Sequence, residues 1–158
     1  MLKHKPKVSY NDVYFRVAAA ITGALLASEY GGTTNIFDRL LSKDFYQEFG
    51  SSLLIALVVI ECIARVTRYL DTGYDWQERP VVRSVLQFIL GIVLPGLIDF
   101  FMAALYFQFF GVNILKDTNY VVYAFPYIMM MILLFNLYYL SYYFFLRARY
   151  FDQVQKQN

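Results

Sequence analysis

Four long apolar stretches are the feature that most constrains how this chain folds. They cover residues 12–29, 50–69, 83–110 and 121–146. About 20 apolar residues cross a bilayer as a helix, and lipid offers no water to an open backbone, so helices rather than strands are expected. Only 16% of the 158 residues are charged and 59% are hydrophobic, which leaves too few polar side chains to cover a water-soluble domain. We therefore predict an all-α integral membrane protein with four transmembrane helices.

The distribution of Lys and Arg predicts the orientation of these helices. Positively charged connections stay in the cytoplasm, so both termini are expected on the cytoplasmic side of the membrane. Eleven of the fourteen basic residues fall on that side, namely Lys3, Lys5, Lys7, Arg16, Arg65, Arg68, Arg79, Arg83, Arg147, Arg149 and Lys156. The other side carries Arg39, Lys43 and Lys116.

The first outer connection is predicted to hold an additional helix over residues 36–49. Asn35 is a suitable N-cap, and Phe37, Leu41, Phe45 and Phe49 recur every four residues with charged residues between them. Such an amphipathic helix fits either the outer membrane interface or the outer mouth of the bundle. At the other end of the chain, residues 148–158 are polar and compatible with a helix, as expected for the start of a cytoplasmic linker.

Composition excludes several classes of function. One cysteine, Cys62, permits no intrachain disulfide, and with His4 as the single histidine no metal, haem or copper site is expected. The net charge of +2 is too small to indicate nucleic-acid binding. The chain carries no P-loop, HExxH or GxSxG motif, so we expect neither an enzyme nor a bound cofactor.

The acidic residues of the second connection and the tyrosines of the fourth stretch are predicted to have structural roles. Asp71, Asp75 and Glu78 alternate with Arg68, Arg79 and Arg83, which indicates a solvated, salt-linked connection. Tyrosines gather near both ends of the fourth stretch, where their rings are expected at the headgroup level. This tyrosine set comprises Tyr120, Tyr123, Tyr127, Tyr138, Tyr139, Tyr142 and Tyr143.

Two carboxylates at membrane depth are candidates for a functional site, because charge is costly there. Glu61 lies near the middle of the second stretch, four residues before Arg65 on the same helix face. A self-neutralising pair with a structural role is one interpretation, and a site for an ion or a proton is the other.

Asp99 is the second deep carboxylate, and it has no partner on its own helix. Ser84, Gln87, Gly91, Pro95 and Asp99 form a small or polar face, and Pro95-Gly96 is expected to kink the helix and free a carbonyl near Asp99. On the fourth stretch Asn136, Tyr139 and Tyr143 form a comparable stripe, so the two faces are predicted to meet inside the bundle. Both interhelical bonding and the sensing of a ligand or proton are consistent with Asp99.

The chain also resembles a known group of membrane domains. The features that carry the resemblance are the segment Tyr10–Arg16 (YNDVYFR) and a series along the second half: Trp76, Pro80, Arg83, Gln87, Gly91, Pro95, Ala103, Tyr106, Phe107, Gly111, Asn113-Ile114-Leu115, Thr118, Tyr120, Phe125-Pro126, Asn136 and Tyr139. This pattern is similar to the N-terminal four-helix membrane domain of Bacteroidetes LytTR-type transcriptional regulators and of LytS-like sensor histidine kinases. The resemblance covers most of residues 10–147. It implies a cytoplasmic output domain after the membrane domain, and this chain contains neither a LytTR domain nor a kinase motif.

The sequence therefore predicts a non-catalytic membrane sensor or anchor module of a signal-transduction protein. Its expected partners are the lipid bilayer, a second copy of itself and an unidentified small ligand or lipid, with no nucleic acid bound by this segment. The candidate sensing residues are Asp99, Glu61, Arg65, Gln87, Asn136 and Tyr139. Two alternatives remain: a small proton or ion transporter that uses Asp99 and Glu61, and a purely structural oligomerisation module.

Overall fold

The computed structural model describes residues 10–29, 38 and 41–157, and within these ranges it contains helices and connections but no strand. The helices are α1 (Val13–Glu29), α3 (Lys43–Gly73), α4 (Pro80–Phe88), α5 (Leu94–Phe109) and α6 (Phe125–Gln157). Two short π-helical segments complete them: η1 (Ile89–Val93) joins α4 to α5 without a break, and η2 (Tyr120–Ala124) leads into α6. The all-α prediction is confirmed for this part of the chain.

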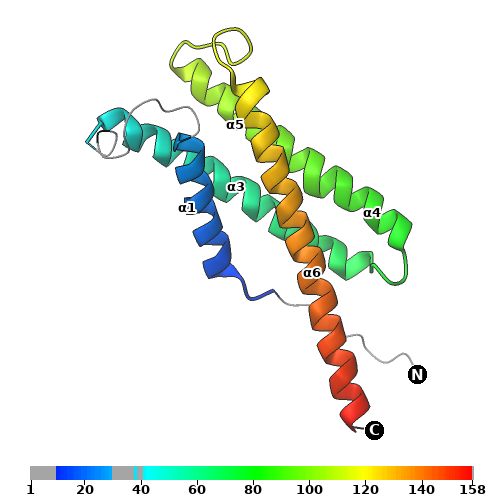
Figure 1. Ribbon diagram of the computed structural model, residues 1–158. Coiled ribbons are helices and arrows are strands. Elements are labelled where there is room, and N and C mark those ends of the chain that lie inside the picture. Colours follow the sequence, from blue (N-terminus) through cyan, green and yellow to red (C-terminus); the bar gives the residue numbers. More distant parts are fainter. Residues whose placement is uncertain (1–9, 30–37, 39–40, 158) are drawn as a thin grey trace.

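Helix α3 lies at the centre of the arrangement and contacts α1, α4, η1, α5 and α6. It forms an antiparallel hairpin with the continuous helix α4–η1–α5, and α6 crosses both (Figure 1). The apolar core lies where α1, α3 and α6 meet. Its buried members are Ala20, Val59, Ile60, Ile63, Ala64, Ile132, Phe135 and Tyr139.

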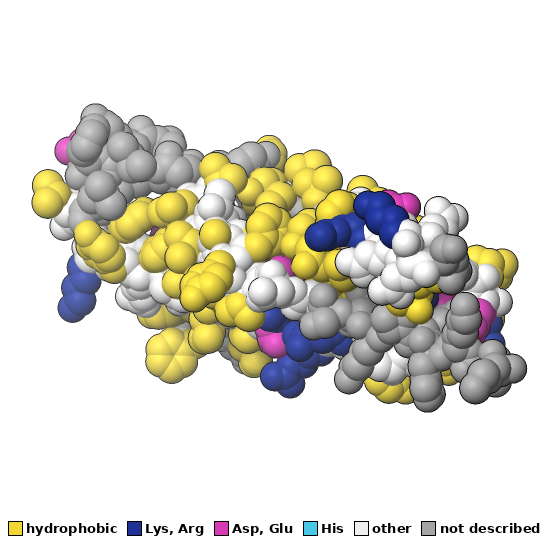
Figure 2. All heavy atoms as spheres, turned by 90° about the horizontal axis from the view of Figure 1, so that it is seen from below, with side chains coloured by type: hydrophobic (Ala, Val, Ile, Leu, Met, Phe, Trp, Pro, Cys, Tyr) yellow, Lys and Arg dark blue, Asp and Glu magenta, His cyan; other side chains and the backbone are white. Residues whose placement is uncertain are grey.

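Three of the helical stretches are long and apolar enough to cross a membrane: Lys43–Gly73, Pro80–Phe109 and Tyr120–Gln157. They contain the predicted spans 50–69, 83–110 and 121–146, apart from residue 110, and extend beyond them. Their outward faces carry large apolar side chains, such as Leu105, Phe109 and Val122, each at least 66% exposed. Figure 2 shows apolar side chains over much of one face, with charged side chains gathered in a few places. Water would disfavour such a surface, whereas lipid would not.

The first predicted span is helical but short. Helix α1 has 17 residues, and at 1.5 Å per residue it is about 25 Å long, a few ångströms less than the hydrocarbon core of a typical bilayer. The structure thus confirms three long apolar helices and leaves the crossing by α1 as a proposal.

One boundary prediction is wrong. A single helix over residues 36–49 does not form, because Ser42 has an extended backbone and α3 begins at Lys43. From there the helix continues through Phe49 and Gly50 into the apolar span, so residues 43–49 and the span form one helix. Within 36–41 the structure describes only Asp38, which is helical, and Leu41, which lies in a turn.

The predicted disturbance around Pro95 takes the form of η1, a π-helical turn that ends two residues before the proline. Proline lacks an N–H group, so Pro95 cannot bond the carbonyl four residues earlier, that of Gly91. Asn136 on α6 donates its amide to that carbonyl at 2.8 Å. A carbonyl does need an outside donor, as predicted, but it lies nearer Gln87 than Asp99.

Candidate functional site

The residues predicted as one sensing set lie in three separate places. Gln87 and Asn136 are hydrogen-bonded to each other at 2.7 Å, which confirms that the polar faces of the third and fourth apolar stretches meet. Asp99 lies apart from them, beside a cavity, and Glu61 with Arg65 forms a third group on α3. Tyr139 is buried, and its ring packs against Tyr10 and Tyr138, with 5.2 Å between ring centroids in each case.

The first place is a buried charge network that we call the Arg83 cluster, defined as Tyr10, Asp71, Arg83, Gln87 and Asn136. The Arg83 side chain is 0% exposed and forms an ion pair with Asp71 at 2.8 Å. It also donates to the Gln87 amide oxygen at 3.1 Å, and Gln87 in turn donates to Asn136. Arg83 is thus bonded on the α3 side and on its own helix, and Gln87 extends the network to α6.

Residues of the connection and of the N-terminal segment provide three further contacts to Arg83 and Asp71. The Tyr74 carbonyl accepts a hydrogen bond from Arg83 at 2.9 Å, and the Trp76 ring lies 4.9 Å from its guanidinium carbon. The Tyr10 hydroxyl donates to Asp71 at 2.7 Å. Burial and the neighbouring Asp71 carboxylate raise the pKa of the Tyr10 phenol, so this hydroxyl keeps its proton and continues to donate.

A neighbouring contact ties α6 to the same connection. Asp75 accepts a hydrogen bond from the Tyr143 hydroxyl and pairs with Arg147 at 3.2 Å, and its side chain is only 10% exposed. The predicted salt-linked connection therefore exists, and it is solvated in part: Glu78 and Arg79 are exposed as predicted, whereas Asp75 is not. The Asp71–Arg83 pair, with Tyr10 on Asp71, and the contacts of Tyr143 and Arg147 with Asp75 leave these acidic side chains at most 10% exposed.

The sequence contained a signal for Arg83 that the polar-face prediction missed. Arg83 lies four residues before Gln87, in phase with Gly91, Pro95 and Asp99, whereas the prediction started the face at Ser84. Ser84 is exposed and its hydroxyl bonds back to its own helix, at the Pro80 carbonyl.

Glu61 and Arg65 make the predicted contact within α3, with 3.3 Å between Nε and the carboxylate. A shorter contact, which the prediction did not include, comes from α1: Arg16 reaches Glu61 at 2.5 Å, and Arg16 also pairs with Asp12 at 3.2 Å. Arg68 lies 3.6 Å from the same carboxylate. Three arginines thus neutralise Glu61, which favours the structural interpretation of this site.

Asp99 lies beside a cavity of about 870 Å³ between α1, α3, α5 and α6, which we call the Asp99 pocket. Asp99 is 4% exposed, and its carboxylate accepts a hydrogen bond from the Tyr120 hydroxyl. Tyr120, for which the sequence predicted only a place at the headgroup level, is half-buried and has this additional partner. No spacing rule indicates this pair, because Tyr120 follows an irregular connection after residue 110.

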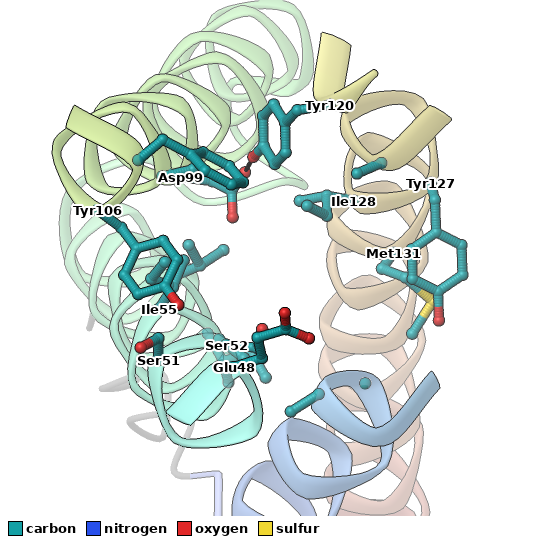
Figure 3. A pocket seen from close by; sticks show the side chains of 18 of the residues that line it. Glu48, Ser51, Ser52, Ile55, Asp99, Tyr106, Tyr120, Tyr127, Ile128 and Met131 are labelled. Atoms are coloured by element: carbon teal, nitrogen blue, oxygen red, sulfur yellow. Dashed lines mark hydrogen bonds between the residues drawn. The ribbon is translucent and has the colours of Figure 1, made fainter. Parts of the chain in front are cut away.

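The lining of the Asp99 pocket is acidic and aromatic. Three carboxylates line it, those of Asp44, Glu48 and Asp99, and its lining within the described part of the chain contains no Lys or Arg. In Figure 3 the Glu48 carboxylate and one oxygen of Asp99 point into the open space from different sides. The aromatic lining comprises Phe45, Tyr106, Phe107, Phe110, Tyr120, Tyr127 and Phe135.

Neither a metal site nor a nucleophilic site is evident among residues 10–29, 38 and 41–157. No group of three or more His, Cys, Asp or Glu side chains there is arranged to hold a metal ion. Cys62 is a half-buried free cysteine. What this arrangement offers chemically is binding: a large cavity, apolar walls and unbalanced negative charge.

Comparisons of the chain with known protein families, with curated proteins and with solved structures find no match.

Proposed function

We propose that this chain is a non-catalytic membrane sensor and anchor module of a bacterial signal-transduction protein. In this proposal the Asp99 pocket receives the stimulus and α6 carries it to a cytoplasmic output. The resemblance of residues 10–147 to the membrane domains of LytTR-type regulators and LytS-like kinases supports this class. The proposal includes four crossings, with α1 as the first, and cytoplasmic termini in the inner membrane, which the distribution of basic residues supports.

The single observation that carries the proposal is the continuity of α6. Its first turns line the pocket through Ile128, Met131 and Ile132, and farther along it bonds to the Arg83 cluster through Asn136. The same helix then runs on to Gln157, past the other helices (Figure 1). A rigid element that contacts both regions and leaves the bundle can transmit a rotation or a shift between them.

The transporter alternative receives less support from the geometry. It needs a polar path between Asp99 and Glu61, but Glu61 does not line the pocket and three arginines engage it. The purely structural alternative needs no cavity at all, so the pocket favours the sensor.

A register experiment on α6 tests the proposal. The chain is fused after Gln157 to a dimerisation-dependent transcription reporter, and one, four or seven residues are inserted after Arg149. Each inserted helical residue rotates the fused domain by about 100°, so seven residues bring it back to within about 20° of its original direction. We expect one and four residues to change reporter output by unequal amounts, and seven residues largely to restore it.

Two outcomes would contradict this expectation. Equal output from all three insertions would mean that the membrane domain is only an anchor. A reporter that is expressed but silent in every variant, the uninserted fusion included, would indicate that Gln157 lies outside the cytoplasm and would overturn the proposed topology. A fusion through a flexible Gly-Ser linker is the control, because it should respond to none of the insertions.

A further inference from the structure

We propose that the Asp99 pocket binds an organic ammonium ion that carries an apolar body, in other words a small cationic amphiphile. The assignment deepens the sensor function and rests on it for its biological consequence. The binding itself follows from three properties of the pocket: its size, its uncompensated carboxylates and its aromatic walls.

The pocket has the dimensions of a site for a small molecule. Its volume of about 870 Å³ lies within the range of roughly 300–1,000 Å³ that is usual for ligand sites. Four helices contribute to its walls, and aliphatic side chains such as Ile55, Val59 and Ile128 provide most of the remaining lining. Such walls suit an apolar ligand body.

The charge of the pocket selects the sign of the ligand. Asp99 is more than nine-tenths buried, and Tyr120 donates to only one of its carboxylate oxygens. The other oxygen faces the cavity (Figure 3), and no other described residue donates to it. A carboxylate in such surroundings needs either a proton or a cation. Glu48 and Asp44 add negative charge to the same cavity, which attracts a cationic ligand and repels an anionic one.

The aromatic walls distinguish an organic cation from a metal ion. Tyr106, Phe107 and Tyr120 line the cavity around Asp99, and aromatic faces attract ammonium groups, most strongly where water is excluded. A metal ion would need several oxygen or nitrogen ligands close together, and the described residues provide no such group. An anionic ligand, such as an acidic lipid headgroup, would meet three carboxylates and, among the lining residues that the structure describes, no Lys or Arg.

Direct binding with a matched pair of probes tests the assignment. The chain is placed in nanodiscs of zwitterionic lipid and dialysed against labelled trimethyl(4-phenylbutyl)ammonium, with 4-phenylbutanesulfonate as the anionic probe of similar shape. Empty nanodiscs correct for partition into lipid. We expect saturable binding of the ammonium probe above that background and none of the sulfonate.

Substitutions locate the bound probe. Asp99→Asn keeps an acceptor for Tyr120 and removes the charge, and it should weaken ammonium binding by about tenfold or more, which corresponds to about 1.4 kcal/mol. Glu48→Gln, on an exposed side chain that should not affect folding, should weaken it by a smaller factor. Asp152→Asn changes the net charge equally, far from the pocket on the last turns of α6, and should leave the affinity unchanged.

The assignment would be overturned if the wild-type chain showed no saturable ammonium binding, or if it bound both probes with equal affinity. It would also be overturned if Glu48→Gln and a folded Asp99→Asn both bound the ammonium probe as tightly as the wild type does. These outcomes are distinct from failure of the sensor proposal. Ammonium binding together with reporter output that ignores the helix register would sustain the ligand and reject the sensor. Reporter output that depends on the helix register, without ammonium binding, would sustain the sensor and reject the ligand.

Discussion

The Arg83 cluster and the Asp99 pocket are built on the same continuous helix, yet they satisfy their charges in opposite ways. Arg83 is bonded to Asp71, to Gln87 and to a backbone carbonyl, and no part of its side chain is exposed. Asp99 has one hydrogen-bond partner among the described residues and faces a cavity. A charge with every partner in place holds helices together, whereas a charge with a position open is available for a ligand.

This difference predicts how each region responds to substitution. A buried ion pair that loses one member leaves the other unpaired, and the penalty is large. A residue beside a cavity already has space around it, so its replacement should affect stability less than binding. Substitutions in the cluster are therefore expected to lower the free energy of unfolding, and substitutions in the pocket to leave it nearly unchanged.

The largest effect is expected for Arg83→Met. The substitution fills a similar volume but leaves Asp71 buried with Tyr10 as its remaining donor, and the free energy of unfolding should fall by about 3–5 kcal/mol. Unfolding in mixed micelles by titration with sodium dodecyl sulfate measures this loss. Arg65→Met is the matched control, because its side chain is 78% exposed and its pair with Glu61 should contribute only about 0.2–1 kcal/mol. Equal losses in the two variants would remove the distinction between a buried and an exposed arginine.

An intermediate effect is expected for Gly91→Ala, beside the Arg83 cluster. A methyl group there would lie 2.5 Å from the Asn136 amide oxygen and 2.6 Å from the Gln87 amide nitrogen, two atoms bonded to each other. Overpacking of this kind should cost about 1–3 kcal/mol in the same unfolding assay.

Gly96→Ala provides the control on the same helix. Its methyl group would meet the sulfur of Met129 at 2.6 Å, and a methionine end can move aside. We expect a clearly smaller loss than for Gly91→Ala. A larger loss would mean that the pocket side of the helix is packed as tightly as the cluster side.

The smallest effect on stability is expected for Tyr120→Phe, which removes the hydroxyl that donates to Asp99. Hydrogen bonds between membrane helices contribute about 0.6 kcal/mol on average and up to about 1.7, so the loss should lie in that range. Exposure of a second oxygen of Asp99 to the cavity should at the same time preserve or raise ammonium affinity. A loss of several kcal/mol would show that Asp99 is held as firmly as Arg83 and would abolish the contrast between the two regions.

The sequence predicted those parts of the fold that depend on one helix at a time. Apolar length identified the three long helices and α1, and the spacing of Glu61 and Arg65 identified a contact that forms. The meeting of Gln87 with Asn136 was also predictable, because two polar stripes in a lipid environment have few other places to go.

What the sequence did not predict depends on contacts between distant segments. The pairs Arg16 with Glu61, Arg83 with Asp71, and Tyr120 with Asp99 join different helices or connections, and no periodicity encodes them. The covering of the Asp71 and Asp75 side chains was missed for the same reason, since their partners Arg83 and Arg147 come from other helices.

The π-helical turn at Ile89–Val93 has a consequence for how the two regions share one helix. Arg83, Gln87, Gly91, Pro95 and Asp99 follow one another at intervals of four, and all are buried. In a uniform α-helix each such interval drifts by about 40°, so Asp99 would face roughly 160° away from Arg83. A π-helical turn takes up more residues per turn and removes part of that drift. The extra residue at this turn therefore sets the angular phase between a charge that fastens the bundle and a charge that faces its cavity.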